Sequence, residues 1–120
     1  IFARASGPDS TSMPREITPS ELVQHLENGH AICLVDVRQP WENALAKLPD
    51  SLLIPLGELP ARAGEIATAP DTLLVVYCHH GVRSLSAAAF LERLGHVHVR
   101  SLAGGIDAWS LEVDPGVPRY

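Results

Sequence analysis

The sequence predicts an α/β domain with a small, doubly wound parallel sheet that carries helices on both faces. Short apolar runs alternate with amphipathic stretches along most of the chain, which is the pattern of strands joined by right-handed helical crossovers. The clearest runs lack the polar alternation of a half-exposed strand, as expected for strands that are covered on both faces. These two observations favour a parallel sheet over an antiparallel one.

The elements can be assigned in chain order. A helix is predicted over residues 17–29, because Thr18 stands at an N-cap, Pro19 at the first helical position and Glu21 at the third, which makes a capping box. The unbroken apolar run of residues 31–37 predicts a buried strand. The remaining elements are, in order, a helix at 39–46, a strand at 51–54, helical turns at 56–66, a strand at 72–77, a helix at 85–94, a strand at 97–102 and a helix at 105–111.

The first residues differ in composition from the rest of the chain. Residues 1–15 are rich in Ser, Thr, Pro and Gly and lack an apolar pattern, so we expect a flexible tail, a linker or a remnant of expression there. The folded domain is expected to span residues 16–120. A chain of 120 residues with 46% hydrophobic and 19% charged residues has the composition of a soluble single domain.

Charge, hydropathy and cysteine count exclude several classes of protein. The net charge of −5 argues against nucleic-acid binding, which depends on neutralising phosphates. No apolar run of the sequence approaches the ~20 residues of a membrane span. Two cysteines cannot make a disulfide scaffold, so a cytoplasmic domain with free thiols is expected.

Cys78 directly follows the most apolar strand, at the sheet edge where open α/β proteins bind ligands. The loop after it feeds a helix N-terminus, whose free amides and dipole lower the pKa of a thiol. Arg83 supplies a nearby cation, and Gly81 allows a turn in which loop amides form an anion cradle. No acid occurs from residue 72 to residue 91, so this edge is expected to be electropositive. Cys78 is therefore the predicted nucleophile, and a small anion the predicted substrate.

Other candidate side chains receive structural interpretations. Cys33 lies in the middle of a strand without a cation beside it and is expected to be an inert core residue. Asp36 is expected to organise loop amides at a strand end and Arg38 to pair with an acid, the alternative being that Arg38 borders the substrate entrance. The histidines form no metal-binding motif, so no metal is expected, and His79 and His80 are interpreted as loop residues that tune the anion site.

Four segments, in their order and spacing, resemble the rhodanese-like sulfurtransferases. The resemblance covers the chain from about residue 17 to residue 120. The segments are the opening helix Ile17–Leu22, the Asp-Val-Arg motif within Leu34–Arg38, the loop Tyr77–Ser84, and the glycine-rich turn and helix Leu102–Trp109.

The resemblance implies a sulfurtransferase in which Cys78 takes a sulfane sulfur from thiosulfate or a protein persulfide. Cys78 would become a persulfide and pass the sulfur to a nucleophilic acceptor, which implies ping-pong kinetics and no cofactor. The residues that would surround or support the persulfide are His79, His80, Gly81, Val82, Arg83 and Ser84 in the loop, with Asp36 and Arg38 behind it.

Two alternatives remain open. Related folds include phosphatases with a Cys-x5-Arg loop, but the spacing from Cys78 to Arg83 is the shorter Cys-x4-Arg of the sulfurtransferases. A non-catalytic interaction module on this fold usually lacks the loop cysteine, which is present here. The sequence therefore favours the sulfurtransferase over both the phosphatase and the interaction module.

Two stretches bear on possible partners. Residues 46–51 read Ala-Lys-Leu-Pro-Asp-Ser where many relatives have Gly-His-Ile-Pro-Gly-Ala, so this loop and any partner surface on it are expected to differ. Residues 105–120 resemble the ending of rhodanese domains that are associated with enzymes adenylating sulfur-carrier proteins. This likeness implies a sulfur-carrier protein or a cysteine desulfurase as a partner, besides a small anionic sulfur donor.

Overall fold

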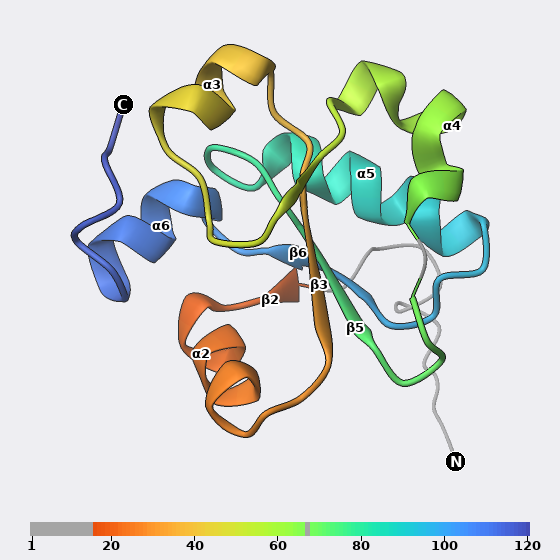
Figure 1. Cartoon of the computed structure of the whole chain (residues 1–120), viewed down its shortest axis with the longest axis horizontal. Helices are drawn as coiled ribbons and strands as arrows, with labels where there is room; N and C mark the ends of the chain where they lie inside the picture. Colours follow the sequence, from red (N-terminus) through yellow and green to blue (C-terminus); the bar gives the residue numbers. More distant parts are fainter. Residues whose placement is uncertain (1–15, 67) are drawn as a thin grey trace.

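The computed structural model describes residues 16–66 and 68–120, so the tail expected over residues 1–15 lies outside the described residues. The strands are β2 (Glu16–Ile17), β3 (Ile32–Asp36), β4 (Leu52–Leu53), β5 (Leu73–Tyr77) and β6 (Val99–Leu102). They pair in parallel in one sheet, in the order β2-β6-β5-β3-β4 (Figure 1). The parallel sheet agrees with the prediction.

Helices cover both faces of this sheet. They are α2 (Pro19–Glu27), α3 (Pro40–Leu45), α4 (Leu59–Arg62), α5 (Val82–Arg93) and α6 (Gly105–Glu112), with the 3-10 helices η1 (Leu56–Glu58) and η2 (Ala63–Glu65) beside α4. The helices α2 and α6 pack on one face, and α4 and α5 pack on the other (Figure 1). This arrangement confirms the doubly wound α/β class. Among the described residues, no helix is long and apolar enough to cross a membrane.

The central strand β5 is buried on both sides. Leu74 and Val76 belong to the core under α5, while Val75 and Tyr77 belong to the core under α2 and α6. Burying a large apolar side chain stabilises the fold by roughly 1.5–3 kcal/mol, so both cores hold this strand in place. The carboxyl end of β5, where Cys78 follows, is consequently a firmly anchored point of the molecule.

The first helix begins as predicted. The Thr18 hydroxyl accepts a hydrogen bond from the Glu21 amide at 3.1 Å, and Glu21 Oε1 accepts one from the Thr18 amide at 2.9 Å, so the capping box is present. The strand β2 before it is absent from the prediction, which assigns no strand to Glu16 and Ile17. Two residues are too few to produce a recognisable strand pattern.

The helix after Cys78 begins earlier than predicted. It starts at Val82 rather than at residue 85, because Gly81 serves as the N-cap with a φ of +98°, a left-handed conformation that favours glycine. Arg83 and Ser84 therefore belong to the first turn of α5 rather than to a loop. Their position in this turn determines what each side chain contacts.

Candidate active site

The Cys78 thiol lies at the focus of the turn that opens α5. The residue is 1% exposed, and Sγ accepts hydrogen bonds from the amides of Gly81 at 3.1 Å and Ser84 at 3.4 Å. Amides at a helix N-terminus stabilise negative charge on a sulfur atom they point to. The anion cradle expected at this position is therefore formed by backbone groups around the sulfur.

Ser84 links the cysteine to the neighbouring strand. The Cys78 thiol donates to Ser84 Oγ at 3.5 Å, and the hydroxyls of Ser84 and Ser101 lie 2.7 Å apart. Both serines are fully buried. Ser101 comes from β6, which borders β5, so the sequence gives no local sign that it supports the site.

The N-terminus of α6 fixes the backbone of the cysteine loop. The Ile106 amide donates to the Cys78 carbonyl at 2.9 Å, and the Asp107 amide donates to the His79 carbonyl at 3.1 Å. Gly105 makes this approach possible, because a Cβ at that position would overlap both carbonyl groups and because its φ is +63°. The glycine-rich turn that the sequence singled out thus holds the loop by close backbone contact.

Arg83, the cation that the sequence predicts near the thiol, directs its guanidinium to an acid of another element. It forms a two-pronged ion pair with Glu42 of α3, with Nη1 2.7 Å from Oε1 and Nη2 2.9 Å from Oε2. These hydrogen bonds are the main cause that lowers the pKa of Glu42 to about 2, which keeps it ionised at neutral pH. Glu42 is a site residue that the sequence analysis missed, because the contact spans 41 positions of the chain.

Tyr120 joins this ion pair from the last residue of the sequence. Its hydroxyl donates to Glu42 Oε2 at 2.7 Å and accepts from Arg38 Nη1 at 2.8 Å. Burial is the main cause that raises the pKa of Tyr120 to about 12, so the hydroxyl keeps the proton it donates at neutral pH. Tyr120 is the second site residue that sequence patterns did not indicate.

Aromatic rings form a row beside the cysteine loop. The Tyr120 ring stacks on His79 with centroids 3.9 Å apart, and His79 stacks on His80 at the same 3.9 Å distance. Trp41 meets Tyr120 edge to face at 6.0 Å. Burial, followed by the proximity of His80, lowers the pKa of His79 and favours its neutral form. The two histidines are thus part of an aromatic wall.

Asp36 and Arg38 form the support beneath the site. Arg38 is fully buried, and its Nε and Nη2 donate to the two carboxylate oxygens of Asp36 at 2.9 and 2.8 Å. Asp36 Oδ1 also accepts from the Arg38 amide at 2.9 Å, and Arg38 Nη2 donates to the Ala46 carbonyl. These contacts agree with the structural interpretation of both residues.

Tyr77 binds the segment that departs from the family pattern, residues 46–51, through its hydroxyl. The Tyr77 hydroxyl accepts from the Leu48 amide at 3.1 Å and lies 2.9 Å from Ser51 Oγ. Leu48 is buried in the core under α2 and α6. A leucine and a serine therefore anchor this loop without the glycines and histidine of the common pattern.

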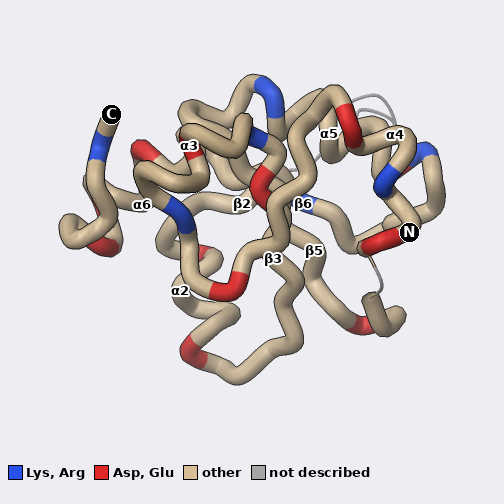
Figure 2. The backbone as a smooth tube through the Cα atoms, turned by 45° about the horizontal axis from the view of Figure 1, so that its top comes forward, with Lys and Arg blue, Asp and Glu red and all other residues tan. Residues whose placement is uncertain are grey.

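The charge around the site corrects the expected electropositive edge. Residues 72–91 lack an acid, but α3 brings Glu42 to Arg83, and α6 brings Asp107 to Arg119 at 2.8 Å. Figure 2 shows acidic and basic positions interspersed along the backbone. The absence of acids from residues 72–91 did not predict the charge of the site, because acids of α3 and α6 lie against this segment in the fold.

His79, His80 and Asp107 bring potential ligand atoms within 4.8 Å of one another. Two features of the geometry disfavour a metal centre there. The Asp107 carboxylate is bound by Arg119, and the imidazole rings stack with an angle of 24° between their planes, so their lone pairs do not converge. His79 Nε2 is buried without a hydrogen-bond partner.

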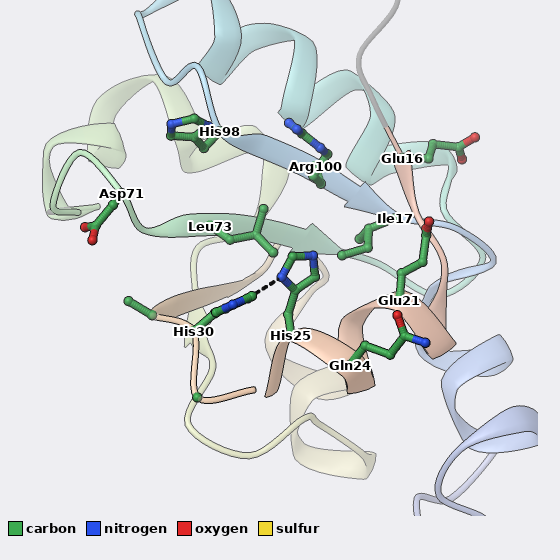
Figure 3. A pocket seen from close by; sticks show the side chains of 12 residues that line it. Glu16, Ile17, Glu21, Gln24, His25, His30, Asp71, Leu73, His98 and Arg100 are labelled. Atoms are coloured by element: carbon green, nitrogen blue, oxygen red, sulfur yellow. Dashed lines mark hydrogen bonds between the residues drawn. The ribbon is translucent and has the colours of Figure 1, made fainter. Parts of the chain in front are cut away.

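A cavity of about 860 Å³ lies at the opposite end of the sheet from Cys78. Its lining comes from the amino ends of β5 and β6 and from the end of α2, where the Nδ1 atoms of His25 and His30 lie 2.7 Å apart (Figure 3). Ligands of parallel α/β sheets bind at the carboxyl ends of the strands. Chemistry centred on Cys78 therefore does not use this cavity.

Cys33 has a different environment from Cys78. It lies within β3 opposite Leu74 of β5 and is half-buried against the core under α5. Burial raises the pKa of its thiol, which disfavours the nucleophilic thiolate. This environment fits the expectation that Cys33 fills the core.

Comparisons with known proteins agree with the fold. The rhodanese-like domain family matches residues 18–112. A protein named sulfurtransferase from Allochromatium vinosum is 40% identical over 98 residues, which cover 82% of this chain and 90% of that protein. The crystal structure of a rhodanese-related protein from Thermoplasma volcanium superposes with a TM-score of 0.74 at 30% identity, covering 88% of this chain and 99% of the other.

The class of protein is defined by a parallel sheet whose central strand leads to a cysteine surrounded by backbone amides. The family match extends over most of this fold. The chain belongs to the rhodanese-like family. It is also 35% identical over 104 residues to a probable adenylyltransferase/sulfurtransferase MoeZ of Mycobacterium tuberculosis. That match covers 87% of this chain but only 26% of MoeZ, so it concerns one part of that longer protein.

Proposed function

We propose that this protein is a rhodanese-type sulfurtransferase that carries a sulfane sulfur as a persulfide on Cys78. The observation that carries the proposal is the position of Sγ, which faces the amides of Gly81 and Ser84 at 3.1 and 3.4 Å. An anion bound at this point gains from the N-terminal dipole of a helix of 12 residues. The sulfurtransferase names of the relatives support the same reaction class.

The reaction consists of two displacements on one sulfur atom. The Cys78 thiolate attacks the outer sulfur of a donor such as thiosulfate, the S–S bond of the donor breaks, and sulfite leaves with the electron pair. A nucleophilic acceptor then attacks the outer sulfur of the persulfide, and Cys78 leaves as a thiolate. Neither displacement consumes an oxidant or a reductant, because each leaving group departs with the electron pair of the broken S–S bond, so the proposed reaction calls for no cofactor.

Backbone amides and the Ser84 hydroxyl have proposed roles in holding the sulfur atoms of the persulfide. The amides of the first turn of α5 stabilise charge on the persulfide, and Ser84 orients Sγ through its hydroxyl. Asp36 and Arg38 keep the loop after β3 in place. The residues proposed to enclose the persulfide are His79, His80, Gly81, Val82, Arg83 and Ser84.

A protein acceptor is a further part of the proposal. MoeZ, and the adenylyltransferase and sulfurtransferase uba4 of Ogataea parapolymorpha at 32% identity, combine two activities in their names. This association supports a sulfur-carrier protein as a partner, with a cysteine desulfurase as another source of the sulfur. The phosphatase alternative gains no support, because the Arg83 guanidinium is committed to Glu42.

Incubation with thiosulfate tests the proposal. We expect the intact protein to gain the mass of one sulfur atom, located on Cys78 by peptide mass spectrometry, and to form thiocyanate when cyanide is added. Cys78→Ser should abolish both signals, whereas the control Cys33→Ser should retain them. Absence of the adduct from the folded wild-type protein with every sulfane donor would contradict the proposed function, as would steady hydrolysis of p-nitrophenyl phosphate that depends on Cys78.

A further inference from the structure

The fixed cations nearest the cysteine loop each have a carboxylate partner in the described chain. Arg83 is paired with Glu42, Arg119 with Asp107, and the buried Arg38 with Asp36. These three guanidinium groups are therefore already neutralised when a small anion approaches Cys78. The backbone amides remain as the main source of positive potential at the sulfur.

Glu42 is the acid that neutralises the cation closest in sequence to the site. Its side chain is 4% exposed, while that of Arg83 is 36% exposed, so the carboxylate is the fixed member of the pair. Beyond Arg83, Glu42 accepts hydrogen bonds from the Tyr120 hydroxyl at 2.7 Å and the Gln39 amide at 3.0 Å. These contacts hold a permanent negative charge beside Arg83.

The surface next to this ion pair is apolar and aromatic. Trp41, which precedes Glu42, is 61% exposed, and Val82 at the start of α5 is 74% exposed. Tyr120 connects Trp41 to the stacked rings of His79 and His80. Such a rim suits a donor that presents a short organic chain better than it suits a strongly hydrated dianion.

We propose that Glu42 is a specificity-determining residue that makes this site favour organic persulfides over thiosulfate as sulfur donors. This inference rests on the proposed function. Thiosulfate brings two negative charges to the Cys78 thiolate, and Glu42 removes the compensation that Arg83 would supply. An organic persulfide carries at most one negative charge, and the form that accepts the thiolate attack is the protonated one, R–S–SH, so it needs less of this compensation than thiosulfate does.

The transfer from an organic persulfide is balanced without a further reactant. The Cys78 thiolate bonds to the outer sulfur, the bond between the two donor sulfurs breaks, and R–S⁻ leaves with the electron pair. Cys78 then carries –S–SH, including the proton that the donor sulfur held. The total charge is the same before and after the step, and neither oxidant nor reductant is consumed.

The test compares two donors in wild type and Glu42→Gln. The donors are thiosulfate and the persulfide of N-acetylcysteine amide, which carries no charge outside the persulfide group. The readout is kcat/KM for formation of the Cys78 adduct, followed by mass spectrometry. In wild type we expect the organic persulfide to be the better donor. In Glu42→Gln we expect the ratio of thiosulfate to organic persulfide to rise about fivefold, because Arg83 is no longer neutralised.

Two further arms separate charge from structure. Glu27→Gln makes the same charge change at an exposed position of α2 and should leave the ratio at the wild-type value. The double variant Glu42→Gln/Arg83→Gln should lose the gain, since the gain depends on the guanidinium. In wild type, the thiosulfate rate should not fall steeply as salt is raised, because the guanidinium groups of Arg38, Arg83 and Arg119 are already paired with carboxylates.

The outcomes distinguish the two proposals. An unchanged or lower donor ratio in folded Glu42→Gln, or a steep fall of the wild-type thiosulfate rate with salt, would overturn the role of Glu42 while leaving Cys78 as the sulfur carrier. If neither donor forms an adduct on Cys78, both proposals fail.

Discussion

At the residue scale, the thiol of Cys78 contacts the Ser84 hydroxyl, which in turn contacts Ser101, a residue that no sequence pattern marks as part of the site. Ser84 lies between Cys78 Sγ and Ser101 Oγ, at 3.5 and 2.7 Å, and all three residues are buried. A buried hydroxyl that loses its partner costs about 1–3 kcal/mol. The serine pair therefore contributes both to stability and to the orientation of the sulfur.

Replacing Ser84 by Ala should separate these contributions. We expect the variant to lose about 1–2 kcal/mol of unfolding free energy, because the Ser101 hydroxyl is left without its buried partner. The rate of Cys78 persulfidation should fall by roughly threefold to tenfold as the sulfur loses one contact. The matched control is Ser86→Ala, at an exposed position of the same helix. Urea unfolding and adduct kinetics measure both effects, and equal values for the two variants would refute this role of Ser84.

The residue scale also shows where prediction from sequence stopped. Cys78, Gly81 and Ser84 could be predicted because the strand, the turn and the helix N-terminus are adjacent in the sequence. Glu42 and Tyr120 could not be predicted in this way. Glu42 is 41 positions from Arg83 in the sequence, and Tyr120 is 78 positions from Glu42, and no local pattern indicates hydrogen bonds between side chains so far apart in the chain.

At the element scale, the site exists because two helix N-termini meet at the end of β5. The first turn of α5 points its amides at Sγ, and the first turn of α6 points its amides at the carbonyls of Cys78 and His79. One set of amides therefore binds the sulfur while the other holds the loop that carries it. Gly105 is the residue that lets the second helix come close enough.

Substitution of Gly105 by Ala should therefore disrupt the loop. The added Cβ would overlap the Cys78 and His79 carbonyl groups, and the φ of +63° is strained for alanine. We expect a loss on the order of 3 kcal/mol in unfolding free energy and a persulfidation rate lower by at least tenfold. Gly64→Ala is the matched control, since its Cβ would meet nothing within 4 Å. A Gly105→Ala protein as stable and reactive as Gly64→Ala would contradict this account.

Elements differ in how well the sequence specified them. The capping box of α2 was predictable, because its signal lies in side chains that bond locally. The early start of α5 was not, because the N-cap is a glycine whose function lies in its φ rather than in a side-chain acceptor. β2 exists only through its pairing with β6, in which Ile17 faces Leu102, so its formation depends on tertiary structure.

At the scale of the whole molecule, the C-terminal segment ties the two sides of the site together. Val117 is buried in the core under α2 and α6, and its carbonyl accepts from Ser110 Oγ at 2.6 Å. Three residues further on, Tyr120 contacts Arg38, Glu42 and His79, which come from different parts of the chain. The net charge of −5 hides this organisation, because the charges that matter at the site occur as specific pairs.

Removing the Tyr120 side chain should loosen the site as a unit. In Tyr120→Ala, Arg38 Nη1 and Glu42 Oε2 lose a shared partner and His79 loses its stacked ring. We expect a loss of about 2–4 kcal/mol and faster hydrogen exchange at the amides of Gly81 and Ser84. Tyr120→Phe keeps the ring and should retain the slow exchange better, since it removes only the hydroxyl.

Leu111→Ala provides the control for loss of a large apolar side chain near the same end of the chain, because Leu111 is 60% exposed. It should change stability by less than about 0.5 kcal/mol and leave exchange at Gly81 and Ser84 unaltered. Hydrogen exchange at the amides of Gly81 and Ser84 is thus expected to be slowest in Leu111→Ala, faster in Tyr120→Phe and fastest in Tyr120→Ala. If Tyr120→Ala exchanged no faster than Leu111→Ala, the cradle would be held by α5 and α6 alone, and the C-terminal segment would have no part in keeping the amides around Cys78.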